Sequence, residues 1–415
     1  MRKFRIIPIA IFSLVSVFGL KSCTDDILQE ETRGVFTPEF FTTELGVQGG
    51  LTYLYQNMRN VFGFAYYLNL TETGTDEYVA AQSANNNFFD LDLAGQGNLS
   101  SESGFSVSVV WGNSFPAINT ASGIIENAEA VGLDNSLIGE ARFFRAFNYF
   151  LLVQNYGGVP LDLGSGELAF NSSAVRTSTR NTVPEVYTKA ILPDLERAVA
   201  DLPDNPRLTG AVTKNVARLF LSKAYLTYAW WLENPNNIPT YPEAPRTDPD
   251  GNDPSYYYQR AYDLAVEGIE NPGPYRLLDC FYDVHVATND RHAEMMLYAD
   301  RTEESQLYNG ADLGYSGPEG SANTAVWMVT SNYTTISVDG VAAVQREAAQ
   351  SYGRPWTRMA PPIGVLTETF AEKELDSRYD ATFVTSYRGN WDKGGSPEPT
   401  LTAANGMEIA PGDAV

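Results

Sequence analysis

Histidine and cysteine are the scarcest reactive residues in this 415-residue sequence, which contains two of each. The histidines are His285 and His292, and the cysteines are Cys23 and Cys280. A His-rich metal motif, a glycine-rich phosphate loop and a G-x-S-x-G nucleophile elbow are also missing. These counts disfavour zinc sites and mechanisms that depend on a Cys–His or Ser–His pair.

Basic residues are few as well. The sequence has 28 Lys and Arg against 51 Asp and Glu, which gives a formal net charge of −23. A chain of this charge has little with which to neutralise phosphates, so nucleic acids and other polyanions are poor partners. The hydrophobic content of 43% is enough for one large domain or two of medium size.

Carboxylates are abundant, so composition alone does not exclude a glycosidase built on paired acids. The pair Asp76-Glu77 is the most suggestive, but carboxylates are mostly exposed and we interpret it as a solvated turn. The stretch TDPDGNDP (247–254) has the alternating acids of a calcium loop. Its glycine and its last acid are misplaced for an EF-hand, so we expect a flexible acidic loop, with weak calcium binding as the alternative.

The first 22 residues have the three parts of an export signal. Basic residues in MRKFR precede an apolar run over 6–20, and LKSC (20–23) follows. The run is shorter than the roughly 20 residues of a membrane-spanning helix, so we predict a cleaved signal. A Leu three places before the cysteine and a small residue directly before it are typical of bacterial lipoproteins. Cys23 is therefore the predicted lipid attachment point, with an ordinary signal peptide or a free thiol as the alternative.

The second cysteine, Cys280, lies in the largely apolar stretch RLLDCFYDV. We expect a buried free thiol. A disulfide with Cys23 is possible in an oxidising compartment, but lipidation explains Cys23 better.

Helical periodicity dominates the first two thirds of the chain. The clearest helix covers 139–161, is apolar around most of its circumference and is ended by Gly157-Gly158 and Pro160. A capping box of Thr182 and Glu185 starts the next helix, in which Pro193 predicts a kink. Further helices are predicted over 209–231 and 256–275, and weaker ones over 47–60 and 111–130.

The helix over 256–275 has an amphipathic pattern. The residues expected on its buried face are Tyr258, Ala261, Tyr262, Ala265, Val266 and Ile269.

The composition changes after residue 285. Gly, Ser, Asn and Thr dominate 305–340, which predicts loops and small strands, followed by one helix near 363–377. The predicted fold is therefore mostly α: a scaffold of helical hairpins similar to tetratricopeptide pairs, without the full 34-residue signature, and an irregular lobe carrying small strands.

Several of these stretches together resemble the SusD/RagB family of Bacteroidetes outer-membrane lipoproteins. The motifs that carry the resemblance are EARFFRAFNYFLLVQNYGGVPL, VYTKAILPDLERAVADLP and GAVTKNVARLFLSKAYLTYA, with VVWGNSFPAINTASGIIENA before them and the D-x-R segment FAEKELDSRYDATF after them. The resemblance runs from Cys23 to the C-terminus and includes the order of the motifs.

This resemblance implies a domain organisation. Residues 1–22 would be the signal peptide and 23–35 the lipidated tether. The helical scaffold, with its tetratricopeptide-like pairs, would cover 36–284 and the ligand lobe 285–415. Family members are usually longer, so we expect a truncated C-terminus.

The resemblance also implies a function. Such proteins are surface-exposed lipoproteins of the outer membrane that capture a nutrient, usually a glycan, and deliver it to a SusC-like TonB-dependent transporter. They are not enzymes, and no cofactor or metal is expected. Asp25 and Asp26, just after the cysteine, look like the acidic signal for export to the outer face.

Ligand-binding residues are expected on loops, where aromatic rings can stack on sugar rings and planar polar groups can bind hydroxyls. The candidates are Asn87, Phe88, Phe89, Tyr315, Asn323, Trp327, Asn332, Tyr333, Arg354 and Trp356. Trp111 is expected to serve packing, and Trp230-Trp231 the core or a transporter interface.

Three other functions stay open at this point. The chain could bind peptides, as some members of the family do. It could be a carboxylate-dependent glycosidase, or a purely structural helical-repeat adaptor, although the leader argues against an intracellular adaptor.

Overall fold

The computed structural model describes residues 37–84, 105–173, 178–301, 326–347, 352–353, 355 and 357–415. Residues 38–415 group into one compact unit, and Met1–Thr37 form a separate unit of which only Thr37 is described. The predicted division between a scaffold and a lobe at residue 285 stays a prediction.

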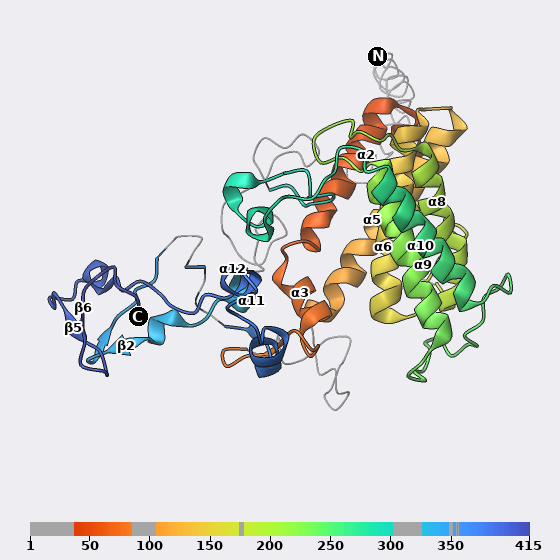
Figure 1. Ribbon diagram of the computed structural model, residues 1–415. Helices are drawn as coiled ribbons and strands as arrows, with labels where there is room; N and C mark the ends of the chain where they lie inside the picture. Colours follow the sequence, from red (N-terminus) through yellow and green to blue (C-terminus); the bar gives the residue numbers. More distant parts are fainter. Residues whose placement is uncertain are drawn as a thin grey trace, which may run out of the picture. The chain divides into compact units, whose positions relative to one another are not determined.

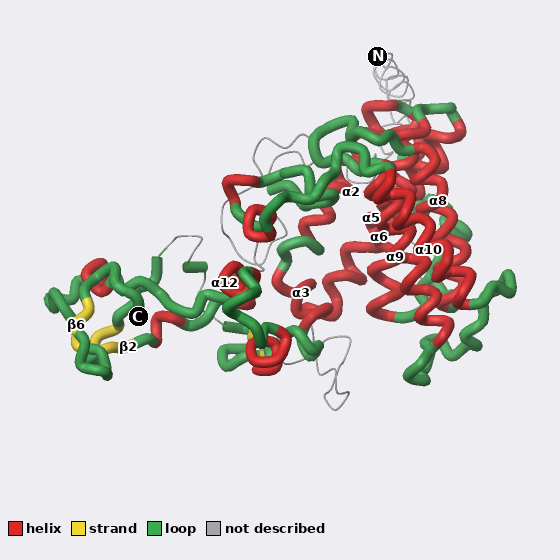
Figure 2. Tube along the Cα trace, in the orientation of Figure 1, coloured by secondary structure: helices red, strands yellow, loops and turns green. Residues whose placement is uncertain are grey.

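Helices make up most of the described chain before residue 271, as the sequence predicted. The longer ones are α2 (Glu44–Asn57), α3 (Ala65–Glu72), α5 (Phe105–Ala130), α6 (Asn135–Tyr156), α8 (Leu192–Asp201), α9 (Lys214–Glu233) and α10 (Pro254–Glu270). Along the chain, α5 packs on α6, α6 on α8, α8 on α9 and α9 on α10, and Figures 1 and 2 show these helices side by side. The mostly helical, tetratricopeptide-like fold class is confirmed.

Helix α6 is the centre of this packing. It begins four residues earlier than predicted, because Asp134 accepts a hydrogen bond from the backbone N–H of Ser136 and caps the helix. It ends at Tyr156 and is capped by Gly157, whose φ of 72° favours glycine. Phe143 and Phe147 both lie edge-on against Phe220 of α9, at 5.3 and 5.6 Å between ring centroids.

A buried ion network joins α6 to α8. Asp194 accepts two hydrogen bonds from Arg145, at 2.6 and 2.8 Å, and a third from Arg142 at 3.0 Å. The side chains of Asp194 and Arg145 are 3% and 7% exposed. Arg142 also pairs with Glu129 of α5 at 2.5 Å, so the network spans three helices.

A second buried carboxylate, Glu140, joins α6 to the N-terminal helix α2. It accepts hydrogen bonds from Tyr55 at 2.6 Å and from the guanidinium of Arg207 at 2.5 and 3.2 Å. The Tyr55 hydroxyl in turn accepts the backbone N–H of Val212 at 2.9 Å. Burial raises the pKa of Glu140, and the Arg207 guanidinium opposes that shift.

The capping box at Thr182 and Glu185 is confirmed. It opens the short helix α7 (Val183–Glu185), with the Glu185 carboxylate accepting the Thr182 N–H at 2.8 Å. The kink predicted at Pro193 takes the form of a π-helical turn, η4 (Val186–Ile191), that directly precedes α8. Proline cannot donate the i to i−4 hydrogen bond, so a widened turn here is physically reasonable.

The buried face predicted for α10 is only partly right. Ala261 is buried as predicted, but Tyr262 and Ile269 are 66% and 78% exposed, and the buried Tyr257 was not in the predicted set. The orientation follows from Tyr257, whose ring packs on Tyr225 and Tyr228 of α9 and whose hydroxyl donates to the buried Asp248 at 2.7 Å. The spacing of apolar residues gave the helix but not the side that meets α9.

The two weaker predicted helices are also present with shifted bounds. Residues 47–60 form α2 followed by the 3-10 turn η3 (Met58–Asn60), and 111–130 belong to the longer α5, which contains Pro116. The remaining short helical turns before residue 290 are η2 (Pro38–Thr42), η5 (Phe281–Val284) and η6 (Ala287–Asn289).

Small antiparallel strand pairs appear in the later chain, as predicted. β1 (Val79–Ala80) pairs with β4 (Met359–Ala360), β2 (Ser337–Val338) with β3 (Val341–Ala342), and β5 (Leu401–Thr402) with β6 (Glu408–Ile409). Short helical turns lie between them: α11 (Val326–Val329), η7 (Tyr333–Thr335) and η9 (Trp391–Gly394).

The single helix predicted over 363–377 is wrong. The segment forms a π-helical turn, η8 (Val365–Thr369), then turns, then α12 (Arg378–Thr382). The chain leaves the helical region at Phe370, with φ −104° and ψ 46°. Asp376 then accepts the backbone N–H of Arg378, a local bond that competes with helix continuation.

The later chain has a small core of its own. Trp391 is fully buried among Tyr333, Val344, Leu401 and Ile409, and its indole N–H donates to Glu398 O at 2.8 Å. Two-residue strands are too short to be stable alone, so this core is what holds the β2–β3 and β5–β6 hairpins.

Cys280 is exposed, so the prediction of a buried thiol is wrong. The apolar residues around it do not enter a core: Leu277 is 82% exposed and Phe281 46%. Separately, no helix in the described part of the chain is long and apolar enough to span a membrane.

We expect replacement of Asp194 by alanine to lower the free energy of unfolding by about 3–5 kcal/mol, because Arg145 would stay buried without its counter-ion. Urea denaturation followed by circular dichroism measures this loss. The matched control is Arg197→Ala on the same helix, which removes a cation whose side chain is 53% exposed from its pair with Asp201 and should cost clearly less, about 1 kcal/mol. Equal losses in the two variants would contradict a dominant role for the buried network.

The capping box predicts a pH effect. The pKa of Glu185 is lowered to about 2 from its ordinary 4.5, chiefly by the hydrogen bond from the Thr182 N–H. A depressed carboxyl pKa stabilises the fold fully above the unfolded value and ceases to do so as pH falls towards 2. In urea titrations, the stability difference between the natural chain and Glu185→Gln should therefore shrink from pH 6 to pH 3. A constant difference would argue against the capping carboxylate.

Candidate ligand-binding site

Most of the residues predicted to bind a ligand lie outside the described residues. They are Asn87, Phe88, Phe89, Tyr315, Asn323, Arg354 and Trp356, together with the predicted lipidation site Cys23. Their roles stay predictions. The structure describes the backbone of Trp327, and it describes Asn332 and Tyr333 fully.

The backbone around Trp327 runs beside the segment that follows Trp356. Trp327 lies in α11, and the next residue, Met328, is buried against Ala65 and Met359. Met328 O accepts the Arg358 N–H at 2.8 Å, and Thr330 O accepts the Thr357 N–H at 2.9 Å. Two predicted binding segments that are distant in sequence therefore meet here.

Tyr333 does not offer a ring to a ligand, which corrects its predicted role. It is 1% exposed, and its ring packs against Tyr352 and Tyr387 at 5.5 and 4.8 Å. Asn332, directly before it, is half-buried and accepts a hydrogen bond from the Thr334 hydroxyl at 2.8 Å. The Tyr333 ring is part of the small core around Trp391 and is not available as a stacking surface.

The two tyrosines that cover Tyr333 are better placed and were not singled out from the sequence. Tyr352 and Tyr387 are half-buried; Tyr387 shares a hydrogen bond with Ser331 at 2.7 Å, and Tyr352 donates to Arg388 O. We call Tyr333, Tyr352 and Tyr387 the tyrosine cluster. Tyr352 precedes Arg354 and Trp356 in SYGRPW, so the composition that selected those residues could also have found it.

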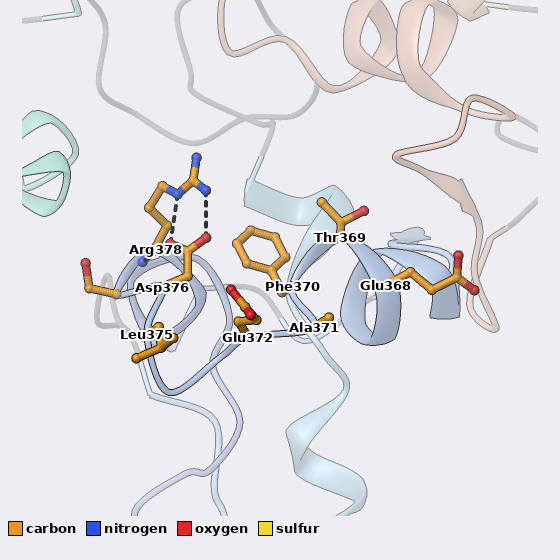
Figure 3. Close-up of a pocket in the computed structure, with 9 residues that line it drawn as sticks. Glu368, Thr369, Phe370, Ala371, Glu372, Leu375, Asp376 and Arg378 are labelled. Atoms are coloured by element: carbon orange, nitrogen blue, oxygen red, sulfur yellow. Dashed lines mark hydrogen bonds and ion pairs between the residues drawn. The ribbon is translucent and has the colours of Figure 1, made fainter.

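A hollow of about 710 Å³ lies in the D-x-R segment. Its lining residues are Glu368, Thr369, Phe370, Ala371, Glu372, Leu375, Asp376, Ser377 and Arg378. Figure 3 shows the Phe370 ring between Thr369 on one side and the Asp376–Arg378 pair on the other. We call this the Phe370 hollow.

Two sets of contacts hold the groups in the Phe370 hollow. The Phe370 ring packs against Tyr379 and Phe383 at 5.8 and 5.5 Å. Arg378 donates two parallel hydrogen bonds to the carboxylate of Asp376, at 2.8 and 2.6 Å. The result is an aromatic ring beside a planar, charged, partly exposed hydrogen-bonding group, which suits a ligand with apolar faces and several hydroxyls.

The protonation state of Asp376 decides whether this residue could act as the general acid of a glycosidase. The Arg378 side chain holds the pKa of Asp376 below its usual range, so this carboxylate stays ionised. A glycosidase needs a carboxylic acid whose pKa is raised so that it can protonate the leaving group. Asp376 is therefore suited to binding and unsuited to serve as that acid.

The other acidic candidates are accounted for by local structure. Asp76 and Glu77 are exposed in a bend, as interpreted from the sequence. In the loop 247–254, the carboxylate of Asp248 accepts hydrogen bonds from the hydroxyls of Tyr228 and Tyr257 and from the backbone of residues 250 and 252. With its oxygens taken by these donors, Asp248 organises a fixed loop and is poorly suited to calcium.

Among the described residues, no group of three or more His, Cys, Asp and Glu side chains is placed to hold a metal ion.

Comparison with known proteins gives one family. The family model SusD-like_3, described as "Starch-binding associating with outer membrane", matches residues 47–226. SusD-like protein P2 of Formosa agariphila is 28% identical over 228 residues, which cover 52% of this chain and 42% of the relative. The chain thus matches about two fifths of the length of that relative.

Solved structures with the same fold are more distant in sequence. A SusD superfamily protein from Parabacteroides distasonis has a TM-score of 0.56 and 20% identity, and the match covers 92% of this chain and 69% of that one. A laminarin-binding SusD-like protein has a TM-score of 0.54 and 20% identity, over 82% and 66% of the two chains. At this identity the likeness concerns the fold alone.

Proposed function

The chain is a SusD/RagB-family protein, above all through residues 47–226, and from this premise we propose that it binds a glycan. In this proposal it is a surface-exposed lipoprotein of the outer membrane, anchored through Cys23. It captures an oligosaccharide and passes it to a SusC-like TonB-dependent transporter, without catalysing a reaction.

The observation that carries the proposal is the arrangement in the Phe370 hollow. A sugar ring has apolar C–H faces and a rim of hydroxyls, so a binding site combines an aromatic ring with planar polar groups. Phe370, held by Tyr379 and Phe383, supplies the ring, and the Asp376–Arg378 pair supplies donors and an acceptor in fixed geometry. Both groups belong to one short segment.

We extend the proposed ligand surface to the predicted loop residues. Trp327 and Asn332 belong to a segment that continues into the tyrosine cluster, where Tyr352 and Tyr387 keep part of their rings accessible. The candidates outside the described residues, Asn87, Phe88, Phe89, Tyr315, Asn323, Arg354 and Trp356, remain part of this proposal.

Peptide binding is the second candidate. The same aromatic rings and the Asp376–Arg378 pair could hold peptide side chains and termini, and the family includes peptide binders by the resemblance stated above. For the glycosidase alternative, the lowered pKa of Asp376 argues against this residue as the general acid.

We expect Phe370→Ala to weaken glycan binding roughly fivefold to tenfold through loss of ring stacking. Calorimetric titration of the purified chain with laminarin, starch and xylan oligosaccharides, and with a mixed peptide pool, measures this. Tyr262→Ala is the matched control, because Tyr262 is 66% exposed and lies on α10, which contributes no lining residue to the hollow. Retained affinity in Phe370→Ala and Trp327→Ala together would refute the placement, and binding of peptides alone would favour the second candidate.

The anchor has its own test. If Cys23 carries the lipid, Cys23→Ala should move the protein from the membrane fraction to the soluble fraction and abolish palmitate labelling. Continued membrane association without labelling would show that something other than a lipid on Cys23 holds the protein.

A further inference from the structure

Figure 1 shows the loop that connects α9 to α10. A second hollow, of about 730 Å³, lies in this loop. Its lining residues are Leu232, Glu233, Asn234, Asn237, Ile238, Pro239, Thr240, Glu243, Ala244 and Arg246. The sequence predicted no site in this loop. We call it the loop hollow.

The loop is fixed to the end of α6 by a close backbone approach. The Gly158 N–H donates to Tyr241 O at 2.7 Å. A Cβ atom at Gly157 would come within 2.6 Å of that same oxygen, and one at Gly158 within 2.0 Å of Asn181 O and 2.8 Å of Pro242 Cδ in the loop. Two adjacent glycines are therefore needed for the loop to sit where it does.

Tyr241 is not itself a lining residue, but it lies in the chain between the lining residues Thr240 and Glu243. The residue is 65% exposed, and the guanidinium of Arg180 lies over one side of its ring at 4.8 Å. Arg180 lies over the Trp111 ring at 5.0 Å and donates to the backbone oxygens of Tyr156 and Gly158. A ring fixed in this way loses little conformational entropy when a ligand stacks on it.

Arg246 fixes the other side of the loop. It donates to Trp231 O in the last turn of α9 and to Ile238 O, both at 2.6 Å, and its guanidinium lies over the Trp231 ring at 4.4 Å. Its Nε is buried without a hydrogen-bond partner. The charge of Arg246 is thus directed at backbone carbonyls of the protein itself.

The charges around the loop hollow define the kind of ligand it can take. Two carboxylates, Glu233 and Glu243, line it, and it lies at the C-terminal end of α9, where backbone carbonyls carry partial negative charge. An anionic ligand would be repelled. One oxygen of Glu233 already accepts the Tyr258 hydroxyl at 2.7 Å. A neutral ligand with many hydroxyl donors would find acceptors in the Glu243 carboxylate, the other oxygen of Glu233 and the amide oxygen of Asn237, with apolar contact at Ile238 and Pro239.

We propose that the loop hollow, together with the exposed Tyr241 that lies in the chain between two of its lining residues, is a second carbohydrate-binding site specific for neutral oligosaccharides. The ligand class rests on the proposed function, but the site is separate from the Phe370 hollow in sequence and in its residues. Its size falls within the 300–1,000 Å³ typical of small-molecule sites.

The test compares two equally exposed tyrosines. Tyr241→Ala should weaken binding of at least one neutral probe (maltohexaose, laminarihexaose or xylohexaose) roughly fivefold to tenfold, whereas Tyr262→Ala should not. Glu243→Gln keeps the side chain's size and should weaken binding of the same probe. Hydrogen exchange should show protection of amides 232–246 when the probe is added to the natural chain. Circular dichroism checks that each variant is folded.

The outcomes separate this site from the general proposal. If Phe370→Ala weakens binding while Tyr241→Ala and Glu243→Gln match the natural chain and 232–246 gain no protection, the second site is refuted and the glycan function stands. If no oligosaccharide binds the natural chain, both fall. Protection of 232–246 by a copurified transporter and not by sugars would make this loop a protein-docking surface, which also overturns the second site.

Discussion

The pairing of Arg145 with Asp194 is the constraint on which the rest of the scaffold depends. Helix α6 is buried around most of its circumference, yet it carries Arg142 and Arg145 into that environment. A buried guanidinium is stable only where a carboxylate meets it in good geometry, and Asp194 provides this from α8. The pair therefore fixes how α6 and α8 are rotated against each other, which apolar contacts alone would specify loosely.

Both proposed binding regions are loops whose positions derive from helices or from a small core. The loop hollow depends on the ends of α6 and α9, to which it is joined by the Gly158–Tyr241 hydrogen bond and by Arg246. The Phe370 hollow depends on a local aromatic cluster and the Asp376–Arg378 pair. In each case a rigid set of contacts holds an accessible ring, and preorganisation of this kind favours binding of weakly interacting ligands such as sugars.

The helical part could be predicted from the sequence because its signals are local. The capping box at Thr182 and Glu185, the stop at Gly157-Gly158 and the irregularity before Pro193 all depend on neighbouring residues. Side-chain burial could not be predicted as well. Cys280 and the apolar residues of α10 have apolar neighbours in the sequence, but whether a side chain is buried depends on which other segments of the chain pack against it. The same holds for the candidate site. Tyr333 was selected because it is an aromatic residue in a segment rich in polar residues, and only the fold reveals that Tyr352 and Tyr387 cover it.

The two glycines at the end of α6 have a consequence for how ligand preference could diverge among related chains. They are not among the lining residues of the loop hollow, yet the position of Tyr241 depends on the space they leave. A side chain introduced at either glycine would displace the loop and redirect the exposed ring without altering one ligand-contacting residue. Ligand specificity in such a protein would then depend partly on the residues at the end of a helix. A comparison of the ligand-contacting residues alone would miss this dependence.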